Sequence, residues 1–96
     1  MGEATLVRRY PRRRRLGQSA LYRLNPPIQS DIEPGAFEYV LVSSNGGWTR
    51  VFPANRCGDV QWWMDVVDLG GAGAQASDEE VLRALGYMVI DEEEEG

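Results

Sequence analysis

Two runs of apolar residues separated by a glycine-containing turn form the clearest pattern along the chain. The first covers residues 37–43 and the second residues 48–52, and both are rich in aromatic and β-branched residues, which favour strands. Asn45-Gly46 lies between them, and this dipeptide is typical of the tight turns that join antiparallel strands. We therefore predict a β-hairpin over residues 37–52, whose first strand lies centrally in a sheet or is covered on two sides, because both faces of that strand are apolar.

Three shorter apolar segments predict further elements around this hairpin. Residues 21–24 predict a short strand that ends at Asn25-Pro26-Pro27, because proline removes ladder donors. Residues 60–67 alternate imperfectly, which favours a third antiparallel strand and leaves a short helical turn as the alternative. Residues 87–90 are expected to form a strand or a hydrophobic plug.

The segment that begins at Ser77 carries the signature of a helix start. Ser77 and Glu80 have the spacing of a capping box, and three acids in the first turn suit the helix dipole. Gly86 is placed to end the helix. We predict a helix from Asp78 to about Leu85 that buries three apolar side chains: Val81, Leu82 and Leu85.

These elements predict one small α+β domain over residues 20–90, with a three- to four-stranded antiparallel sheet and one short C-terminal helix. Residues 1–19 lack the apolar periodicity of a packed element and are expected to form a flexible arginine-rich arm. Residues 91–96 are expected to form an acidic tail, and residues 70–76 a mobile connector. The packed part is small enough for stability to be marginal, so a partner or self-association is expected to support it.

Charge divides the chain into a basic start and an acidic remainder. Residues 1–30 carry a net charge of +6 and residues 31–96 carry −11, which gives the overall −5. Six arginines cluster around Tyr10: Arg8, Arg9, Arg12, Arg13, Arg14 and Arg15. Such a segment can neutralise phosphates and stack on bases, or it can bind an acidic protein surface. The acidic remainder confines any nucleic-acid contact to this arm, and the tail is interpreted as a solubilising end.

Missing residue types exclude most catalytic chemistries. The chain has no histidine and no lysine, which excludes imidazole bases, histidine-ligated zinc and Schiff-base lysines. The acids Asp59, Asp65 and Asp68 have no metal-ligand spacing. The lone Cys57 excludes an internal disulfide and is interpreted as a passive turn residue, with a reactive thiol beside Arg56 as the lesser alternative. We predict no enzymatic activity, no catalytic residue, no metal and no cofactor.

The location expected from the sequence is the cytoplasm, which is the host cytoplasm if the chain is phage-encoded, with the virion as the alternative. No apolar run is long enough to span a membrane, and the basic stretch is followed by residues 16–20, which do not resemble a signal-peptide hydrophobic region. A single cysteine suits a reducing compartment.

Trp62 and Trp63 form the first candidate binding site. Adjacent residues on a strand point to opposite faces, so at least one of the two indoles is expected near the surface. Tryptophan is enriched among the residues that dominate protein interfaces. We therefore predict a protein-interaction site at Trp62 and Trp63; if the segment is helical instead, both rings are expected to be partly buried.

Several short motifs carry a family resemblance. They are Tyr22-Arg23-Leu24-Asn25-Pro26-Pro27, residues 39–43, residues 49–54, Gly58-Asp59-Val60 and Leu85-Gly86-Tyr87. In these motifs the chain resembles a group of small proteins of actinobacteria and their bacteriophages that have no assigned activity. Those proteins usually carry an acid near the position of Arg50 and one tryptophan in place of Trp62-Trp63. The resemblance implies a phage or mobile-element origin and the binding of a host or virion component, and it does not include the arginine arm.

Together these patterns predict a non-catalytic protein-interaction module. The expected partner is a host protein, a virion component or a second copy of the chain, bound without a membrane. The alternative is a nucleic-acid accessory factor that acts through Arg8, Arg9 and Arg12–Arg15.

Overall fold

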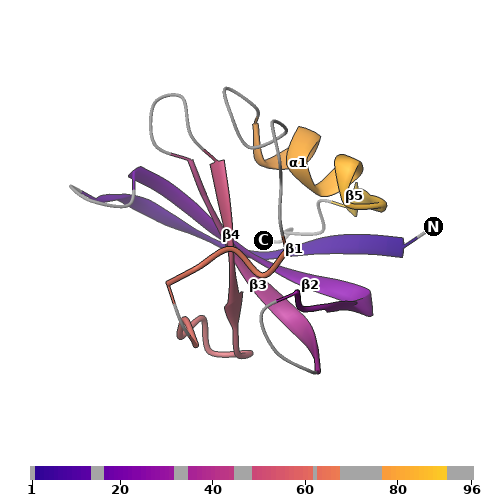
Figure 1. Cartoon of the computed structure of the whole chain (residues 1–96). Helices are drawn as coiled ribbons and strands as arrows, with labels where there is room; N and C mark the ends of the chain where they lie inside the picture. The colour runs from indigo at the N-terminus through magenta and orange to yellow at the C-terminus, as the bar shows by residue number, and fades with distance from the viewer. Residues whose placement is uncertain are drawn as a thin grey trace.

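The computed structural model describes residues 2–13, 17–31, 35–44, 49–61, 63–67 and 77–90, and of residues 11–13 and 17 it describes the backbone alone. Figure 1 shows how the sheet and the short helix of the described residues are arranged. In chain order the elements are β1 (Gly2–Arg13), β2 (Gly17–Gln29), β3 (Ala36–Ser44), β4 (Thr49–Ala54), α1 (Asp78–Ala84) and β5 (Tyr87–Ile90).

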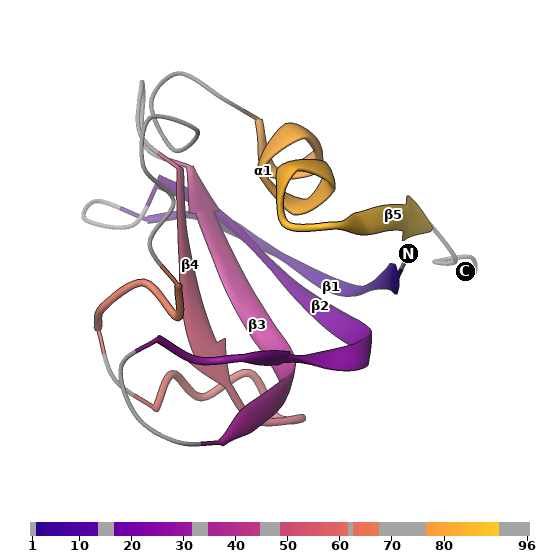
Figure 2. The same ribbon diagram turned by 45° about the vertical axis from the view of Figure 1, so that its right-hand side comes forward.

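The sheet has five strands in the order β4-β3-β2-β1-β5. The first four strands form an antiparallel meander, and β5 lies parallel to β1 at one edge. The helix α1 packs over one face of this sheet (Figure 2). The chain is therefore a small α+β fold as predicted, but its sheet is mixed and has one strand more than the largest predicted number.

The prediction of a flexible arm is wrong for residues 2–13 and 17–19, which form β1 and the start of β2. Ala4 and Leu6 are buried in the core under α1, and the ladder to β2 runs from Glu3 to Arg13. A register shift between Leu6 and Arg8 inserts Val7 as a bulge. The bulge moves later side chains to the other face, so the strand's alternation is hidden in the sequence.

The predicted strand over residues 21–24 is confirmed as the middle of a much longer β2. This strand had been expected to stop at Asn25-Pro26-Pro27, yet it continues to Gln29. The prolines fall in the interval between Arg23 and Ile28 where the register with β3 shifts. Their missing donors therefore remove no regular ladder hydrogen bond.

The predicted hairpin is confirmed as β3 and β4, which pair antiparallel from Tyr39–Ala54 to Ser44–Thr49. Its connecting residues, 45–48, lie outside the described part of the chain. The second apolar run ends at residue 52 in the sequence, yet the strand continues through Pro53 to Ala54. Proline is tolerated here because β4 is an edge strand.

The segment that follows β4 is neither the strand nor the helical turn predicted for residues 60–67. It makes one isolated bridge, Val60 to Ala54, and otherwise bends along the outer edge of β4. Gln61 N–H donates to Pro53 O (2.8 Å) and Val66 N–H to Val51 O (2.8 Å). The segment thus covers the edge of the sheet without joining it as a strand.

The predicted helix is confirmed with its caps. Ser77 Oγ accepts from Glu80 N–H (3.2 Å), and Glu80 Oε1 accepts from Ser77 N–H (3.1 Å), which completes the capping box. Gly86 follows the helix with a φ of 96°, a left-handed conformation that glycine adopts without strain. Tyr87–Ile90 forms a strand, one of the two predicted alternatives.

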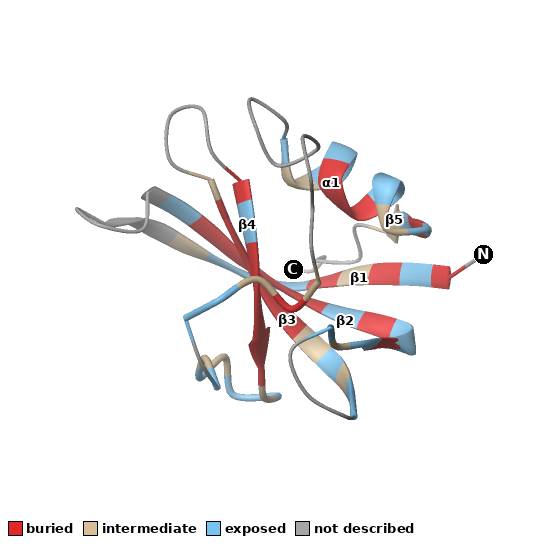
Figure 3. Ribbon diagram, viewed as in Figure 1, coloured by how far each residue is buried: buried red, intermediate tan, exposed pale blue. Residues whose placement is uncertain are grey.

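Buried residues predominate along β4 and recur along β2 and β3, as the red stretches in Figure 3 show, and they belong to two cores on opposite faces of the sheet. The core under α1 includes Tyr22, Leu24, Val40, Val42, Val81 and Leu82. A smaller core on the opposite face contains Leu21, Leu41, Phe52 and Ala54. The first hairpin strand was predicted to lie centrally or to be covered on two sides, and the second alternative is confirmed, because β3 lies between β4 and β2 and supplies both cores. Within the described residues, no helix has the length and apolar character needed to cross a membrane.

Candidate binding site on the sheet face opposite the helix

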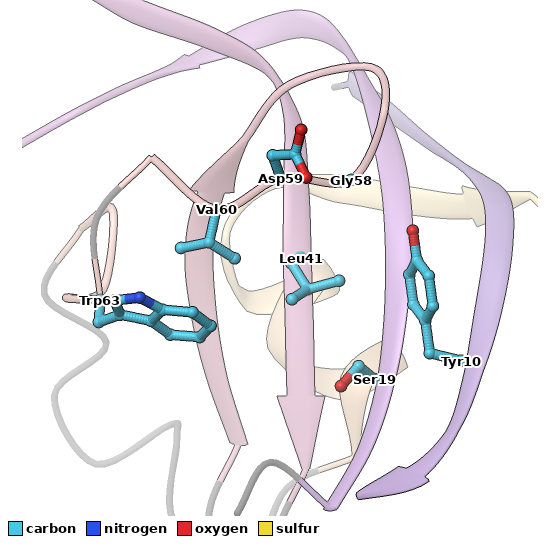
Figure 4. Close-up of a pocket in the computed structure, with 7 residues that line it drawn as sticks. All are labelled: Tyr10, Ser19, Leu41, Gly58, Asp59, Val60 and Trp63. Atoms are coloured by element: carbon cyan, nitrogen blue, oxygen red, sulfur yellow. The ribbon is translucent and has the colours of Figure 1, made fainter.

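The sheet face opposite α1 carries a hollow of about 210 Å³. We call it the aromatic hollow and define it by its lining residues: Tyr10, Ser19, Leu41, Gly58, Asp59, Val60 and Trp63. In Figure 4, Tyr10 and Trp63 stand on opposite sides of Leu41, with Val60 and Asp59 along the rim and the Ser19 hydroxyl near the base of Tyr10.

Strand pairing explains the floor of the aromatic hollow. Leu21 on β2 is opposite Leu41 on β3, and Leu41 is opposite Phe52 on β4. Directly opposite side chains lie on the same face of an antiparallel pair, so these three form one apolar row. The row gives the hollow a rigid base within the sheet.

The bulge at Val7 places Tyr10 in the aromatic hollow. Leu6 faces α1, so unbroken alternation would also turn Tyr10 toward the helix. The extra residue reverses the alternation, and Tyr10, paired with Ser19, packs instead on the opposite face. One irregularity in β1 therefore brings the arginine-rich segment to this site.

A tight turn after β4 builds the rim. Asn55 Oδ1 accepts from the N–H groups of Cys57 (2.9 Å) and Asp59 (3.0 Å), and Gly58 N–H donates to Asn55 O (2.9 Å). Gly58 has a φ of 90°, and a Cβ there would overlap the Tyr10 hydroxyl. The turn can approach Tyr10 this closely only with glycine at position 58.

Trp63 forms the far wall and remains 58% exposed. Its ring meets Phe52 edge to face, with centroids 5.2 Å apart and planes at 69°. The neighbouring Met64 is 57% exposed. The predicted surface position of one tryptophan thus agrees with Trp63, although the segment is not a strand. Trp62 lies outside the described residues, so the predicted contrast between the two rings stays a prediction.

The structure separates the two described arginine side chains of the predicted arm. Arg8 is exposed on the hollow side, with its guanidinium carbon 6.0 Å from the centre of the Tyr10 ring. Arg9 lies on the helix side, where its Nη1 is 3.7 Å from Asp78 Oδ2. Arg12 and Arg13 end β1, and Arg14 and Arg15 lie outside the described residues. Of the two arginines whose side chains are described, Arg8 lies beside the aromatic hollow and Arg9 does not.

Perturbed ionisation is found away from the hollow. Burial, together with the hydrogen bond that Tyr22 Oη donates to Asp78 (2.7 Å), raises the pKa of Tyr22 well above its ordinary value. Burial likewise raises the pKa of Tyr87, whose hydroxyl donates to Pro26 O (2.7 Å). Both tyrosines anchor the C-terminal elements to β2, which is a structural role.

The three acids considered in the sequence do not gather at one place. Asp59 is exposed at the rim of the hollow, Asp65 lies at the edge of β4, and Asp68 falls outside the described residues. Cys57 is a free, exposed thiol in the turn after β4. Among the residues with described positions, no three acidic or cysteine side chains are grouped to hold a metal ion.

The chain matches no protein-family model, no curated protein and no solved structure. The resemblance to actinobacterial and phage proteins therefore stays a prediction. What the site offers must be derived from its own geometry.

Sequence reasoning did not anticipate Tyr10, Ser19 or Leu41 as site residues. Tyr10 was assigned to a flexible arm, and Leu41 was expected simply to be buried in the sheet. Gly58 in the Cys57-Gly58-Asp59 turn was a signal in the sequence that could have located the rim of the hollow, because a glycine inside a tight turn often marks the close approach of another group.

Proposed function

We propose that this chain is a non-catalytic protein-interaction module that binds a partner segment in the aromatic hollow. The observation that carries the proposal is Trp63, which is 58% exposed on the wall of a concave site with Leu41 at its floor. Tryptophan and tyrosine dominate binding energy where they line such sites. An apolar side chain that fills the hollow gains about 1.5–3 kcal/mol from burial.

The charge beside the hollow narrows the chemistry of the partner segment. The Arg8 guanidinium lies near the Tyr10 ring, and no ion pair joins it to an acid among the described residues. Arg50, near Phe52, already pairs with Asp65 at 3.3 Å. Arg8 is thus a cation available to a partner on the Tyr10 side of the hollow, which favours a segment with an aromatic or aliphatic side chain next to a carboxylate.

The proposal also includes the source of the partner. The resemblance to phage-associated proteins supports a host or virion protein as the natural ligand. Binding by the hollow requires no nucleotide, metal or covalent step, so the module acts by occupancy alone.

Selection from a library of displayed random peptides tests this proposal on the intact chain. We expect enrichment of peptides that carry an aromatic or aliphatic residue beside Asp or Glu. Trp63→Ala should weaken an enriched peptide by about thirtyfold, which corresponds to the roughly 2 kcal/mol of a dominant interface residue. Met64→Ala is the matched control, because Met64 is equally exposed but does not line the hollow; its effect should stay within about threefold.

A further variant keeps the test valid if Trp63→Ala proves unstable. Arg8→Glu changes an exposed side chain, so the fold should be retained by circular dichroism while acidic peptides lose affinity. The proposal is wrong if no peptide family is enriched, or if enriched peptides bind the Trp63 and Arg8 variants as tightly as the unchanged protein.

A second candidate function is the binding of single-stranded nucleic acid. The specific observation is that Arg8 and Tyr10 share one sheet face with Trp63, and stacking aromatic rings beside arginines suit unpaired bases. Deletion of residues 1–16 would remove β1, so point substitutions are needed to test this idea. Titration with a single-stranded oligonucleotide should then give salt-dependent binding that Arg8→Ala weakens; absence of binding at low salt removes this candidate.

A further inference from the structure

The two edges of the sheet differ in how their backbone groups are satisfied. At the β4 edge, Val51 N–H donates to Asp65 Oδ1 (2.9 Å), and the carbonyls of Val51 and Pro53 accept from the segment that follows the strand. Pro53 has no N–H to satisfy. The β4 edge is therefore closed to an additional strand.

The β5 edge is open within the described part of the chain. Gly2 N–H donates to Gly86 O (2.9 Å), which sets the phase of the parallel ladder between β1 and β5. The backbone N–H and C=O groups of alternate residues point to opposite sides of a strand. Those of Met88 therefore point toward β1, whereas those of Tyr87 and Val89 point outward. No described residue is hydrogen-bonded to these four outward groups. Such an edge is a template for another strand.

Met88 adds apolar surface to this edge. Tyr87 and Val89 pack into the core under α1, so the Met88 side chain lies on the opposite face, where it is 54% exposed. Methionine adapts its shape readily to an apolar neighbour. The edge thus presents both unpaired backbone groups and a side chain that gains from being covered.

We infer that β5 pairs antiparallel with β5 of a second copy of this chain, about a two-fold axis at Met88. The outward groups of Tyr87 and Val89 are two residues apart, so each Tyr87 can exchange both hydrogen bonds with Val89 of the partner subunit. The two strands are then joined by four hydrogen bonds, to which each chain contributes two residues. Met88 faces the partner's Met88 in the non-hydrogen-bonded position, where side chains come closest.

Charge favours this occupant and this orientation. Five consecutive acids follow β5 at residues 91–95. A parallel arrangement would start both acidic segments side by side, whereas the antiparallel pair separates them. Each β5 then runs toward the end of the partner's α1. On the described chain that end carries Arg83, whose side chain is 70% exposed and has one long, exposed ion pair, 3.9 Å from Glu79 Oε2. Opposite charges are thus brought together and like charges are kept apart.

The pairing is independent of the proposed function. The aromatic hollow is lined from β1, β2, β3 and the segment after β4, while the new contact lies at the far edge beyond β1. A self-paired protein would present two aromatic hollows, and each would remain open.

Disulfide trapping tests the two-fold axis directly. Cys57→Ser first removes the only native thiol, and Met88→Cys is added to that chain. Directly opposite Cβ atoms in antiparallel strands lie about 4.5–5.5 Å apart, close to the roughly 3.5–4.5 Å that a disulfide needs. We expect mild oxidation to give a covalent dimer. Glu79→Cys in the same background is the control, because Glu79 is exposed on α1 away from the β5 edge, and this variant should give no covalent dimer.

Sedimentation of the protein without added cysteines gives the second measurement. We expect a concentration-dependent dimer, and Met88→Lys should raise its Kd by about tenfold or more, because it replaces apolar burial with two facing like charges. Circular dichroism checks that this variant is folded. A monomer at every concentration, or equal cross-linking of the Met88→Cys and Glu79→Cys chains, would overturn the inference.

Discussion

Asp65 should stabilise the fold more than a partly exposed acid usually does, because both of its carboxylate oxygens are used. Oδ1 accepts from Val51 N–H at 2.9 Å, and Oδ2 lies 3.3 Å from Arg50 Nη2. Val51 is 0% exposed, so water cannot easily accept a hydrogen bond from its N–H when the carboxylate is removed. Asp65→Ala therefore removes the acceptor of the buried Val51 N–H as well as the ion pair with Arg50.

The size of the effect follows from these two contacts. A buried donor without a partner costs about 1–3 kcal/mol. The ion pair is partly exposed on both sides and adds about 0–1 kcal/mol. We expect a loss of about 2 kcal/mol, which lowers Tm by roughly 8–16 °C in a domain of this size.

Thermal and urea unfolding of three variants measures the prediction. Arg50→Gln removes the ion pair and the guanidinium beside the Phe52 ring but leaves the Val51 hydrogen bond in place, so a larger loss of stability in Asp65→Ala measures that hydrogen bond. Asp59→Ala is the matched control, because Asp59 is an exposed acid on the same segment, and its substitution should change stability by less than about 0.5 kcal/mol. The reasoning is refuted if Asp65→Ala destabilises no more than Arg50→Gln.

Three further substitutions test other parts of the structure. The pKa of Tyr22 is raised in the folded state, so the Tyr22 hydroxyl contributes fully to the free energy of unfolding below its ordinary pKa of 10.0, and this contribution is lost as pH rises above that value. Tyr22→Phe should therefore cost about 1–2 kcal/mol of stability at pH 7. Urea unfolding from about pH 7 to 12 should show a smaller alkaline loss of stability for this variant than for the unchanged protein. Gly58→Ala should destabilise by about 1–3 kcal/mol through its positive φ and the Tyr10 hydroxyl, and Tyr10→Phe in the same chain should restore part of the loss, measured by Tm. Ser77→Ala should cost about 1 kcal/mol by removing the helix cap, again read from urea unfolding; an unchanged midpoint would contradict the capping role.

Local chemistry made the hairpin and the helix predictable from the sequence. Residues 37–43 carry strand-forming side chains on both faces, and they lie in β3, an interior strand of the sheet. Ser77 and Glu80 define the helix start by their spacing alone, and the capping box forms as expected. In both cases the determining residues lie close together in the chain.

Features that depend on distant partners were not predictable in this way. Residues 2–13 form a strand because β2 and β5 supply their ladders, and the bulge at Val7 breaks the alternation that would have revealed it. The segment after β4 is held by hydrogen bonds to Val51 and Pro53 rather than by its own periodicity.

The candidate site was predictable only in part for the same reason. Trp63 could be selected because an exposed tryptophan is a common interface residue. Its opposite wall, Tyr10, comes from more than 50 positions earlier and reaches the hollow only through the bulge. No spacing rule connects the two residues before the sheet is known.

The most direct test of this account is a measurement of proton contacts around Tyr10 by nuclear Overhauser spectroscopy on the full chain. We predict contacts from the Tyr10 ring to Gly58 and to the Leu21 methyl protons, because Gly58 approaches both side chains. We also predict slow amide exchange across the ladder between β1 and β2. Random-coil shifts and rapid exchange for residues 2–13 would contradict the shared sheet face on which the aromatic hollow and its proposed function depend.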